Sequence, residues 1–267
     1  MVCREITRPH IAIPDLAGLW TRSLIEWADG SRDNSTKVFW LQGKSHFIDL
    51  RQPASLPCFP DAKCRNDLTR LDCLALSRQE GFAGHLQTNA DAYEWVRVID
   101  YQPTQNQADA GFLHWQNATL IETGRDLPYT EHWHREKGFT SSVPLNFQLE
   151  DATTGCRAAF LMVGRDFMFA RDRSASLPAG TTLHDAISHT ASEEEARLLI
   201  DCEISFGRIT EPGGPLIIHN STLPWKTGTP FQFDLSGESL VTISDVAPNG
   251  KNLMRRWRRV NTEGNGR

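Results

Sequence analysis

The side chains most able to do chemistry lie in one stretch of the chain, residues 111–136. The stretch is rich in histidine, acidic and aromatic residues: His114, Trp115, Glu122, Tyr129, Glu131, His132, Trp133 and His134. Two carboxyl groups and a phenol can supply a general acid and a general base, and clustered imidazoles can ligate a metal ion. Which chemistry is available depends on the elements that carry these side chains and on the face that each side chain takes.

The carboxyl groups and the phenol fall on two short strand-like segments, 119–123 and 129–135. Because successive side chains of a strand point to opposite faces, Tyr129, Glu131 and Trp133 share one face. We favour the register that turns this face into a barrel, since aromatic walls beside a few charges are typical of a small-molecule pocket. The predicted inward side chains are Trp20, Trp40, Arg97, Glu122, Tyr129, Glu131 and Trp133. The catalytic candidates are Glu131, Glu122 and Tyr129, and the ligand-binding candidates are Trp20, Trp40, Arg97, His114 and Trp133.

Some of these residues have a purely structural interpretation. A carboxylate such as Glu131 among aromatic rings is desolvated, which favours its acid form, whereas Arg97 nearby would oppose that shift. A buried Arg97–Glu131 pair could therefore fix the strand register and do no chemistry. Asp49 and Arg51 share a face of segment 45–51, where they either line the rim of the pocket or, as we favour, form a surface ion pair.

The histidines suggest a metal site that the rest of the sequence does not support. His132 and His134 point to one face of their strand and could hold a metal ion together with His114. No further ligand follows nearby, so we predict no metal. The P-loop, G-x-G-x-x-G and G-x-S-x-G motifs are also absent, which disfavours nucleotide cofactors and nucleophile-elbow hydrolases. We predict no cofactor.

The overall composition excludes several classes of partner. Lys and Arg number 28 against 33 Asp and Glu, a net charge of −5, so no basic field exists to hold nucleic acid or anionic lipid. No apolar run reaches the length of about 18 residues that a membrane span needs, and the N-terminus lacks a stretch typical of a signal peptide. We therefore expect a cytoplasmic protein without a membrane partner, whose six cysteines are free thiols.

Short β-rich runs separated by turn residues fill the first half of the chain. After the third run comes a proline-rich loop, 52–66, and then Asp67 can cap a helix through Leu74. The predicted strands are 20–27, 36–42, 45–51, 81–88, 93–102, 112–116, 119–123 and 129–135. Eight antiparallel strands joined by short links close most economically into an up-and-down barrel, because closure removes exposed sheet edges. A barrel of this size can hold one small ligand.

The same pattern restarts after residues 138–142, which we interpret as a domain junction. Three strand-like runs precede a helix that begins at the capping box of Ser192 and Glu195, and further strand-like runs follow it. The predicted fold is all-β, with two antiparallel β-barrels side by side and one short helix in each. The predicted domains are 1–137 and 138–267, with a disordered tail after about residue 260.

Several short motifs resemble those of one family. Gly18-Leu19-Trp20 at the start of the first strand is similar to the lipocalin G-x-W signature, in which the tryptophan closes the barrel floor. With the motifs that follow, the chain resembles the double lipocalin-like family of fungal and bacterial proteins, whose yeast member was named as a casein-kinase interactor. These motifs are Gly81-Phe82-Ala83-Gly84, residues 95–100, Glu122-Thr123-Gly124 and Tyr129-x-Glu131-x-Trp133. The resemblance implies that both barrels are lipocalin-like and implies little about activity.

Three functions from different classes fit these observations. The first is a cytoplasmic lipocalin-like protein that binds a small apolar or aromatic molecule in the N-terminal barrel. The second is a cofactor-independent enzyme, a hydratase, cyclase or isomerase that uses the barrel carboxylates. The third is a protein-interaction module with solid barrels and a protein partner. The sequence leaves the oligomeric state open.

Overall fold

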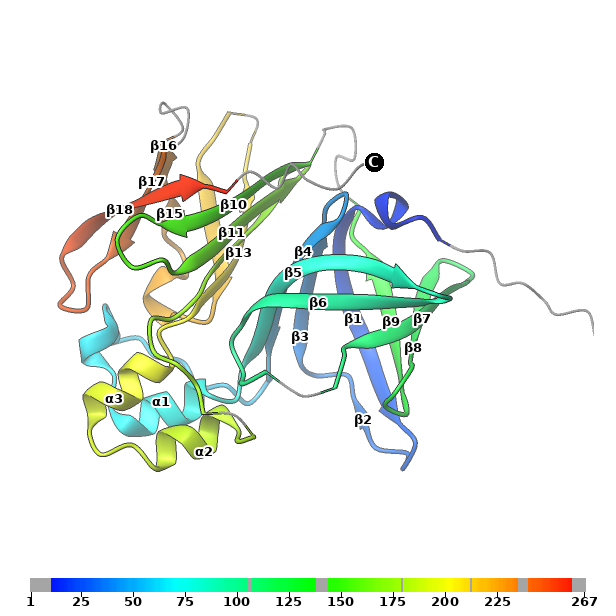
Figure 1. Ribbon diagram of the computed structural model, residues 1–267, viewed down its shortest axis with the longest axis horizontal. Helices are drawn as coiled ribbons and strands as arrows, with labels where there is room; N and C mark the ends of the chain where they lie inside the picture. Colours follow the sequence, from blue (N-terminus) through cyan, green and yellow to red (C-terminus); the bar gives the residue numbers. More distant parts are fainter. Residues whose placement is uncertain are drawn as a thin grey trace, which may run out of the picture.

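The computed structural model describes residues 11–104, 107–137, 144–178, 180–211, 213–234 and 240–260. Two antiparallel sheets of nine strands each curl into barrels, and a few short helices accompany them (Figure 1). The first barrel is closed and the second is nearly closed. The prediction of an all-β chain with two antiparallel barrels side by side is therefore confirmed.

The first barrel is a meander built between residues 18 and 135. Its strands are β1 (Gly18–Trp27), β2 (Arg32–Asp33), β3 (Lys37–Gln42), β4 (His46–Gln52), β5 (Glu80–Asn89), β6 (Ala92–Asp100), β7 (Ala110–Gln116), β8 (Thr119–Gly124) and β9 (Tyr129–Arg135). The two-residue strand β2 pairs with β1 at one edge, and β1 also pairs with β9, which closes the barrel. All eight predicted strands are present, with boundaries displaced by at most two residues.

Tryptophan side chains and the 3-10 helix η1 (Ile13–Leu16) close one end of the first barrel. The Trp20 indole N–H donates to the carbonyl oxygen of Leu16 at 2.8 Å, which anchors η1 against the ring. Trp20 is fully buried and stacks on Trp40, with ring centroids 5.6 Å apart. This position agrees with the barrel-floor role that the G-x-W motif implies for Trp20.

The second barrel repeats the meander between residues 145 and 259. Its strands are β10 (Leu145–Asp151), β11 (Arg157–Val163), β12 (Asp166–Arg171), β13 (Glu203–Ile209), β14 (Leu216–Ser221), β15 (Pro230–Phe231), β16 (Phe233–Asp234), β17 (Leu240–Val246) and β18 (Asn252–Arg259). Strands β10 and β18 pair, so β15 and β16 are left as the two edges of the sheet. Only Gln232 separates these two edges along the chain, and the ring of strands is thus nearly complete.

Phenylalanine rings fill the interior of the second barrel. Phe160 stacks on Phe167 and Phe231, with ring centroids 6.0 and 5.6 Å apart. Phe169 and the buried Trp257 extend the same cluster, with ring centroids 6.4 Å apart. Close packing of this kind leaves the centre of the second barrel occupied by side chains.

Three α-helices lie together beside the second barrel, although α1 comes from the first half of the chain (Figure 1). They are α1 (Arg70–Leu76), α2 (Leu183–Ser188) and α3 (Glu193–Leu199), with single 3-10 turns η2 (Arg65–Asp67) and η3 (Pro224–Lys226). The two predicted helices are α1 and α3, and α2 is an addition within residues 174–191, which looked irregular in sequence. The signal for α2 was Thr182, whose hydroxyl accepts the N–H of Asp185 at the helix start. Thr69, not Asp67, caps α1 in the same way.

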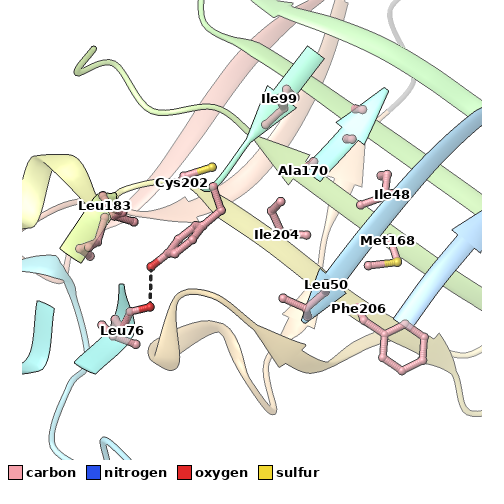
Figure 2. Packing of buried hydrophobic residues seen from close by; sticks show 14 of the residues in the cluster. Ile48, Leu50, Leu76, Ile99, Met168, Ala170, Leu183, Cys202, Ile204 and Phe206 are labelled. Atoms are coloured by element: carbon pink, nitrogen blue, oxygen red, sulfur yellow. Dashed lines mark hydrogen bonds between the residues drawn. The ribbon is translucent and has the colours of Figure 1, made fainter. Parts of the chain in front are cut away.

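A shared hydrophobic core joins the two barrels and the three helices. The outer side of β4 supplies Ile48 and Leu50, which face Met168 of β12 and Ile204 of β13 (Figure 2). Other members of this cluster come from the helices, such as Leu76 of α1 and Leu183 of α2 (Figure 2). Apolar area that would be exposed on either barrel alone is buried where the two meet.

Two of the predictions from the sequence concern segments that the structure does not describe. The predicted domain junction at 138–142 and the predicted tail after residue 260 lie outside the described residues. In the described part of the chain, no helix is both long enough and apolar enough to cross a bilayer.

Candidate functional site

A cavity of about 410 Å³ enters the first barrel. Its lining comes from strands β1 to β6, β8 and β9 and from the connections next to them. Ligand pockets in proteins span roughly 300–1,000 Å³, so this volume is at the small end of that range. The cavity shows that the first barrel has space inside it.

Three indole rings of the cavity wall, those of Trp40, Trp95 and Trp133, contact one another. Trp40 meets Trp133 and Trp95 edge to face, with ring centroids 5.3 and 5.9 Å apart. All three rings line the cavity, whereas Trp20 stacks behind Trp40 and is not among the lining side chains. A ligand in the cavity would therefore contact Trp40, Trp95 and Trp133 and would reach Trp20 only through Trp40.

Glu122 of β8 is buried in the cavity wall and held by two neutral donors. The Tyr129 hydroxyl donates to its Oε1 atom at 2.8 Å, and the Trp133 indole N–H donates to its Oε2 atom at 3.1 Å. Two glycines leave the space for this arrangement. A Cβ atom on Gly124 would lie 2.6 Å from the Tyr129 ring, and one on Gly111 would lie 3.0 Å from Cγ of Glu122.

Glu131 of β9 lies directly opposite Glu122 in the β8–β9 ladder and has cationic partners instead. Nη1 of Arg22 lies 2.5 Å from its Oε1 atom, and Nη1 of Arg51 lies 3.8 Å from the same oxygen. The side chains of Arg22 and Glu131 are almost fully buried, so this ion pair is shielded from solvent. The structural alternative predicted for Glu131 named Arg97 as its partner, and that identity is wrong.

Strand β1 contains a bulge directly after Arg22. The register of β1 against β9 shifts between Arg22 and Leu24, which leaves Ser23 as the extra residue. Simple alternation would place Leu24 inside after Arg22, but the bulge places Ile25 inside, opposite Glu131. Arg22 shares the inner face with Trp20 and was identifiable from that spacing, yet the sequence analysis missed it.

Arg97 forms ion pairs with two other carboxylates, those of Asp109 and Asp100. Its guanidinium donates to Asp109 at 2.6 Å and to Asp100 at 3.0 Å, and its Cζ atom lies 3.5 Å from the centre of the Phe82 ring. A second bulge, in the pairing of β6 with β5, makes these contacts possible, because Phe82 pairs with Asp100 whereas Gly84 pairs with Arg97. Asp100 thus lies on the same face of β6 as Arg97, whereas strict alternation would place the two on opposite faces.

Asp49 and Arg51 at the end of β4 also belong to the cavity. Nε of Arg51 donates to Oδ1 of Asp49 at 2.9 Å, and both side chains are among the lining. Asp49 is only 2% exposed. The favoured prediction of a surface ion pair is wrong, and the alternative in which both residues line the pocket is the one observed.

Burial and mutual repulsion change the protonation of these carboxyl groups. Burial raises the pKa of Glu122 well above its ordinary value of 4.5, and the nearby Glu131 and Asp109 carboxylates raise it further. Burial also raises the pKa of Asp49, against the opposing effect of Arg51. The pKa of Tyr129 is raised by burial and by the Glu122 and Glu131 carboxylates, so its phenol remains protonated. The site therefore holds a protonated carboxyl group beside an arginine-paired carboxylate.

The histidines lie elsewhere. His132 and His134 are on the outer face of β9, where Nε2 of His134 lies 2.9 Å from the Ser23 hydroxyl. His114 alternates along β7 with Leu113, which packs inside the barrel, so His114 is not part of the cavity lining. Among the described residues, no three or more His, Cys, Asp or Glu side chains form a group that could hold a metal ion.

The structure thus brings most of the predicted residues to one place. The predicted residues that line the cavity are Trp40, Arg97, Glu122, Tyr129, Glu131 and Trp133. Trp20 lies behind this wall and His114 outside it. The lining side chains that the analysis did not predict include Arg22, Trp95 and Asp109. Chemically, the arrangement offers aromatic faces for a flat ligand, carboxylate oxygens for hydrogen-bond donors, and one acid–base pair.

Comparison with known proteins supports the fold. No family model and no curated protein matches the sequence. Among solved structures, the chain is similar to the crystal structure of the uncharacterized protein YLR301w from Saccharomyces cerevisiae, with a TM-score of 0.53 and 14% sequence identity. The match covers 91% of this chain and 97% of that chain. At this level of identity the likeness shows a shared fold alone.

Proposed function

We propose that the protein binds a small aromatic molecule inside its first barrel. The observation that carries the proposal is the contrast between the barrels: the first holds a cavity of about 410 Å³ lined by four tryptophans, whereas phenylalanines pack in the interior of the second. Charged walls make a purely apolar ligand less suitable than an aromatic one with a polar group, because an apolar ligand would bury charges without new partners.

A ligand screen by thermal shift and tryptophan fluorescence tests this proposal. Aromatic and terpenoid compounds are added to the full chain, and binding is expected to raise the melting temperature because the ligand binds only the folded state. Stacking on Trp40, Trp95 or Trp133 is expected to change the indole emission as well. No response from any compound would contradict the proposal.

A variant that fills the cavity separates binding inside the barrel from binding on its surface. Thr36 lines the cavity, so Thr36→Trp adds an indole at the cavity wall. The matched control is Asn34→Trp, which adds the same bulk at an exposed position of the same connection. Binding is expected to be lost in the first variant and kept in the second.

Acid–base catalysis is the second candidate function, and the pairing of Glu122 with Glu131 favours it. Glu122 holds a proton and could act as a general acid, whereas Glu131 next to Arg22 and Arg51 could act as a general base. Tyr129, bonded to Glu122, would orient the acid. An isomerase, hydratase or cyclase that needs no cofactor is consistent with such a pair.

The test of catalysis is turnover of whichever compound binds. Glu131→Gln is expected to abolish turnover while binding remains measurable, because glutamine keeps the shape of the side chain and cannot accept the proton. Unchanged turnover of every bound candidate in this variant would exclude Glu131 as the base and leave the protein a binding protein.

We also propose a cytoplasmic location for the protein and a place among the double lipocalin-like proteins. Five cysteines are free thiols, which supports a reducing compartment such as the cytoplasm: Cys58, Cys64, Cys73, Cys156 and Cys202. The double-barrel fold and the barrel-floor position of Trp20 support a place among double lipocalin-like proteins.

A further inference from the structure

We propose that the cavity of the first barrel selects a small organic cation, an amine joined to an aromatic ring, over neutral and anionic molecules of the same shape. This inference rests on the proposed function and adds the charge of the ligand to it. The observation behind it is an excess of carboxyl groups in the lining: Asp33, Asp49, Glu80, Asp109, Glu122 and Glu131, against Arg22, Arg51, Arg78 and Arg97.

Three of the four arginines in the cavity lining are paired with carboxylates, and the fourth, Arg78, donates to the Ser55 hydroxyl. Arg22 pairs with Glu131 and Asp33, and Arg97 pairs with Asp109 and Asp100. Arg51 pairs with Asp49 and lies near Glu131. An anionic ligand at Arg22, Arg51 or Arg97 would have to break one of these pairs, and at any of the four arginines it would meet the lining carboxylates, so anions are disfavoured.

Three of the lining carboxylates, in contrast, each have one oxygen available to accept a hydrogen bond from a ligand. Both arginines near Glu131 approach its Oε1 atom, Arg51 uses only Oδ1 of Asp49, and Arg97 contacts only Oδ2 of Asp109. Within the described residues, the second oxygen of each carboxylate accepts no hydrogen bond. An ammonium group has three N–H donors and no acceptor, which suits oxygens of this kind, and hydrogen bonds between ionised partners are the strong ones.

The indole rings add a second reason for a cation. Cations are attracted to the faces of aromatic rings, most strongly to tryptophan. The protein already uses this interaction inside the barrel, because the Cζ atoms of Arg97 and Arg51 lie 3.5 and 5.1 Å from the centre of the Phe82 ring. Trp95 and Trp133 offer further faces beside the carboxylates.

The protonation of Glu122 fits the same inference. Glu122 faces Tyr129 and Glu131 of β9, Asp109 before β7, and Arg51 of β4. Burial raises its pKa in the empty cavity, so it is protonated there, and a bound cation would favour its ionised form. Binding of an amine is then expected to release a proton, and binding of a neutral analogue is not.

The experiment uses three probes of matched size: 2-phenylethylamine, 2-phenylethanol and phenylacetate. Calorimetric titration of the full chain at pH 7 is expected to show the amine binding at least about tenfold more tightly than the alcohol, with no measurable binding of the acid. Repeating the amine titration in buffers of different ionisation enthalpy detects the released proton. Equal or tighter binding of the alcohol or the acid would overturn the inference.

Two variants connect the preference to the cavity. Asp109→Asn removes one carboxylate at the cavity edge while Arg97 keeps Asp100, and it is expected to weaken amine binding severalfold without changing alcohol binding. The matched control is Glu150→Gln, an exposed residue of the second barrel that pairs with Arg258, and it is expected to change neither. An Asp109→Asn variant that binds the amine as wild type does would count against carboxylate recognition.

The outcomes separate this inference from the proposed function. A neutral or anionic aromatic that binds in the screen while 2-phenylethylamine does not would leave the proposed function standing and overturn the cation preference. No binding by any member of the screen or of the matched series would overturn both.

Discussion

Glu122 on β8 and Glu131 on β9 lie directly opposite each other with both side chains inside the first barrel. Two like charges in this position destabilise a sheet. The protein gives the two carboxyl groups different partners: Glu131 has the guanidinium groups of Arg22 and Arg51, and Glu122 has the neutral donors Tyr129 and Trp133. We infer that Glu131 carries the charge and Glu122 the proton.

Glu131→Gln is expected to lower the free energy of unfolding by about 3 kcal/mol, because removing one partner of a buried ion pair leaves the other charge uncompensated. The side chains of Arg22 and Glu131 are 7% and 3% exposed, and Arg22 would retain only Asp33 at 3.6 Å. Urea unfolding measures the loss. The control is Glu150→Gln, whose pair with Arg258 is exposed and contributes at most about 1 kcal/mol. A similar small loss in both variants would show that the Arg22–Glu131 pair does not stabilise the barrel.

The free energy of unfolding of Glu122→Gln is expected to increase relative to that of wild type as the pH rises. The raised pKa of Glu122 means that the folded state keeps a proton which the unfolded state loses above pH 4.5, so the contribution of Glu122 to wild-type stability falls as the pH rises above that value. Glutamine mimics the protonated acid and removes this dependence. The difference between variant and wild type should therefore grow by about 1.4 kcal/mol per pH unit in this range.

Urea unfolding at pH 5, 6 and 7 provides the measurement for Glu122. Other groups with shifted pKa values, such as Asp49 and Asp100, are present in both proteins and cancel in the difference. A difference between Glu122→Gln and wild type that stays constant with pH would mean that Glu122 is ionised in the folded state.

The strands and the closure of the barrel could be predicted because hydrophobic alternation and turn residues are local signals. The partners of the charged residues could not all be predicted. Ser23 in β1 and Val98 in β6 each shift the register by one residue, which turns Ile25 and Asp100 inward. The pair of Arg97 with Asp100 depends on the second bulge. Arg22 and Arg97 are both inside the barrel, and which of them meets Glu131 depends on the order of the strands around the barrel, where β1 pairs with β9. Burial is equally non-local: Asp49 of β4 lines the same cavity as Glu131 of β9, which is far from it in the sequence.

Phe206→Ala is expected to destabilise both barrels together, by about 3–5 kcal/mol. Phe206 of β13 is buried and stacks on Phe39 of β3 with ring centroids 4.4 Å apart, so one contact belongs to both barrels. Indole fluorescence reports mainly on the first barrel, which holds Trp20, Trp27, Trp40, Trp95, Trp115 and Trp133, and far-ultraviolet circular dichroism reports on both. The two probes should give the same, lowered transition midpoint in urea. A shift seen by circular dichroism without a shift in fluorescence would show that the barrels unfold independently.

Gly124→Ala is expected to disrupt the site more than Tyr129→Phe does. A Cβ atom at residue 124 would lie 2.1 Å from the carbonyl oxygen of Leu127 and 2.6 Å from the Tyr129 ring, so the start of β9 must move. Overpacking of this kind costs about 1–3 kcal/mol. Tyr129→Phe leaves the backbone in place and removes only the 2.8 Å hydrogen bond to Glu122, worth about 0.5–1.5 kcal/mol.

Urea unfolding of Gly124→Ala, Tyr129→Phe and the double variant tests this order. Because the clash with the Leu127 carbonyl involves backbone, most of the cost of Gly124→Ala should persist when Tyr129 is already phenylalanine. Ligand binding should weaken in Gly124→Ala, since displacement of β9 also moves Glu131 and Trp133. A Gly124→Ala variant with wild-type stability and binding would show that residue 124 does not set the position of Tyr129.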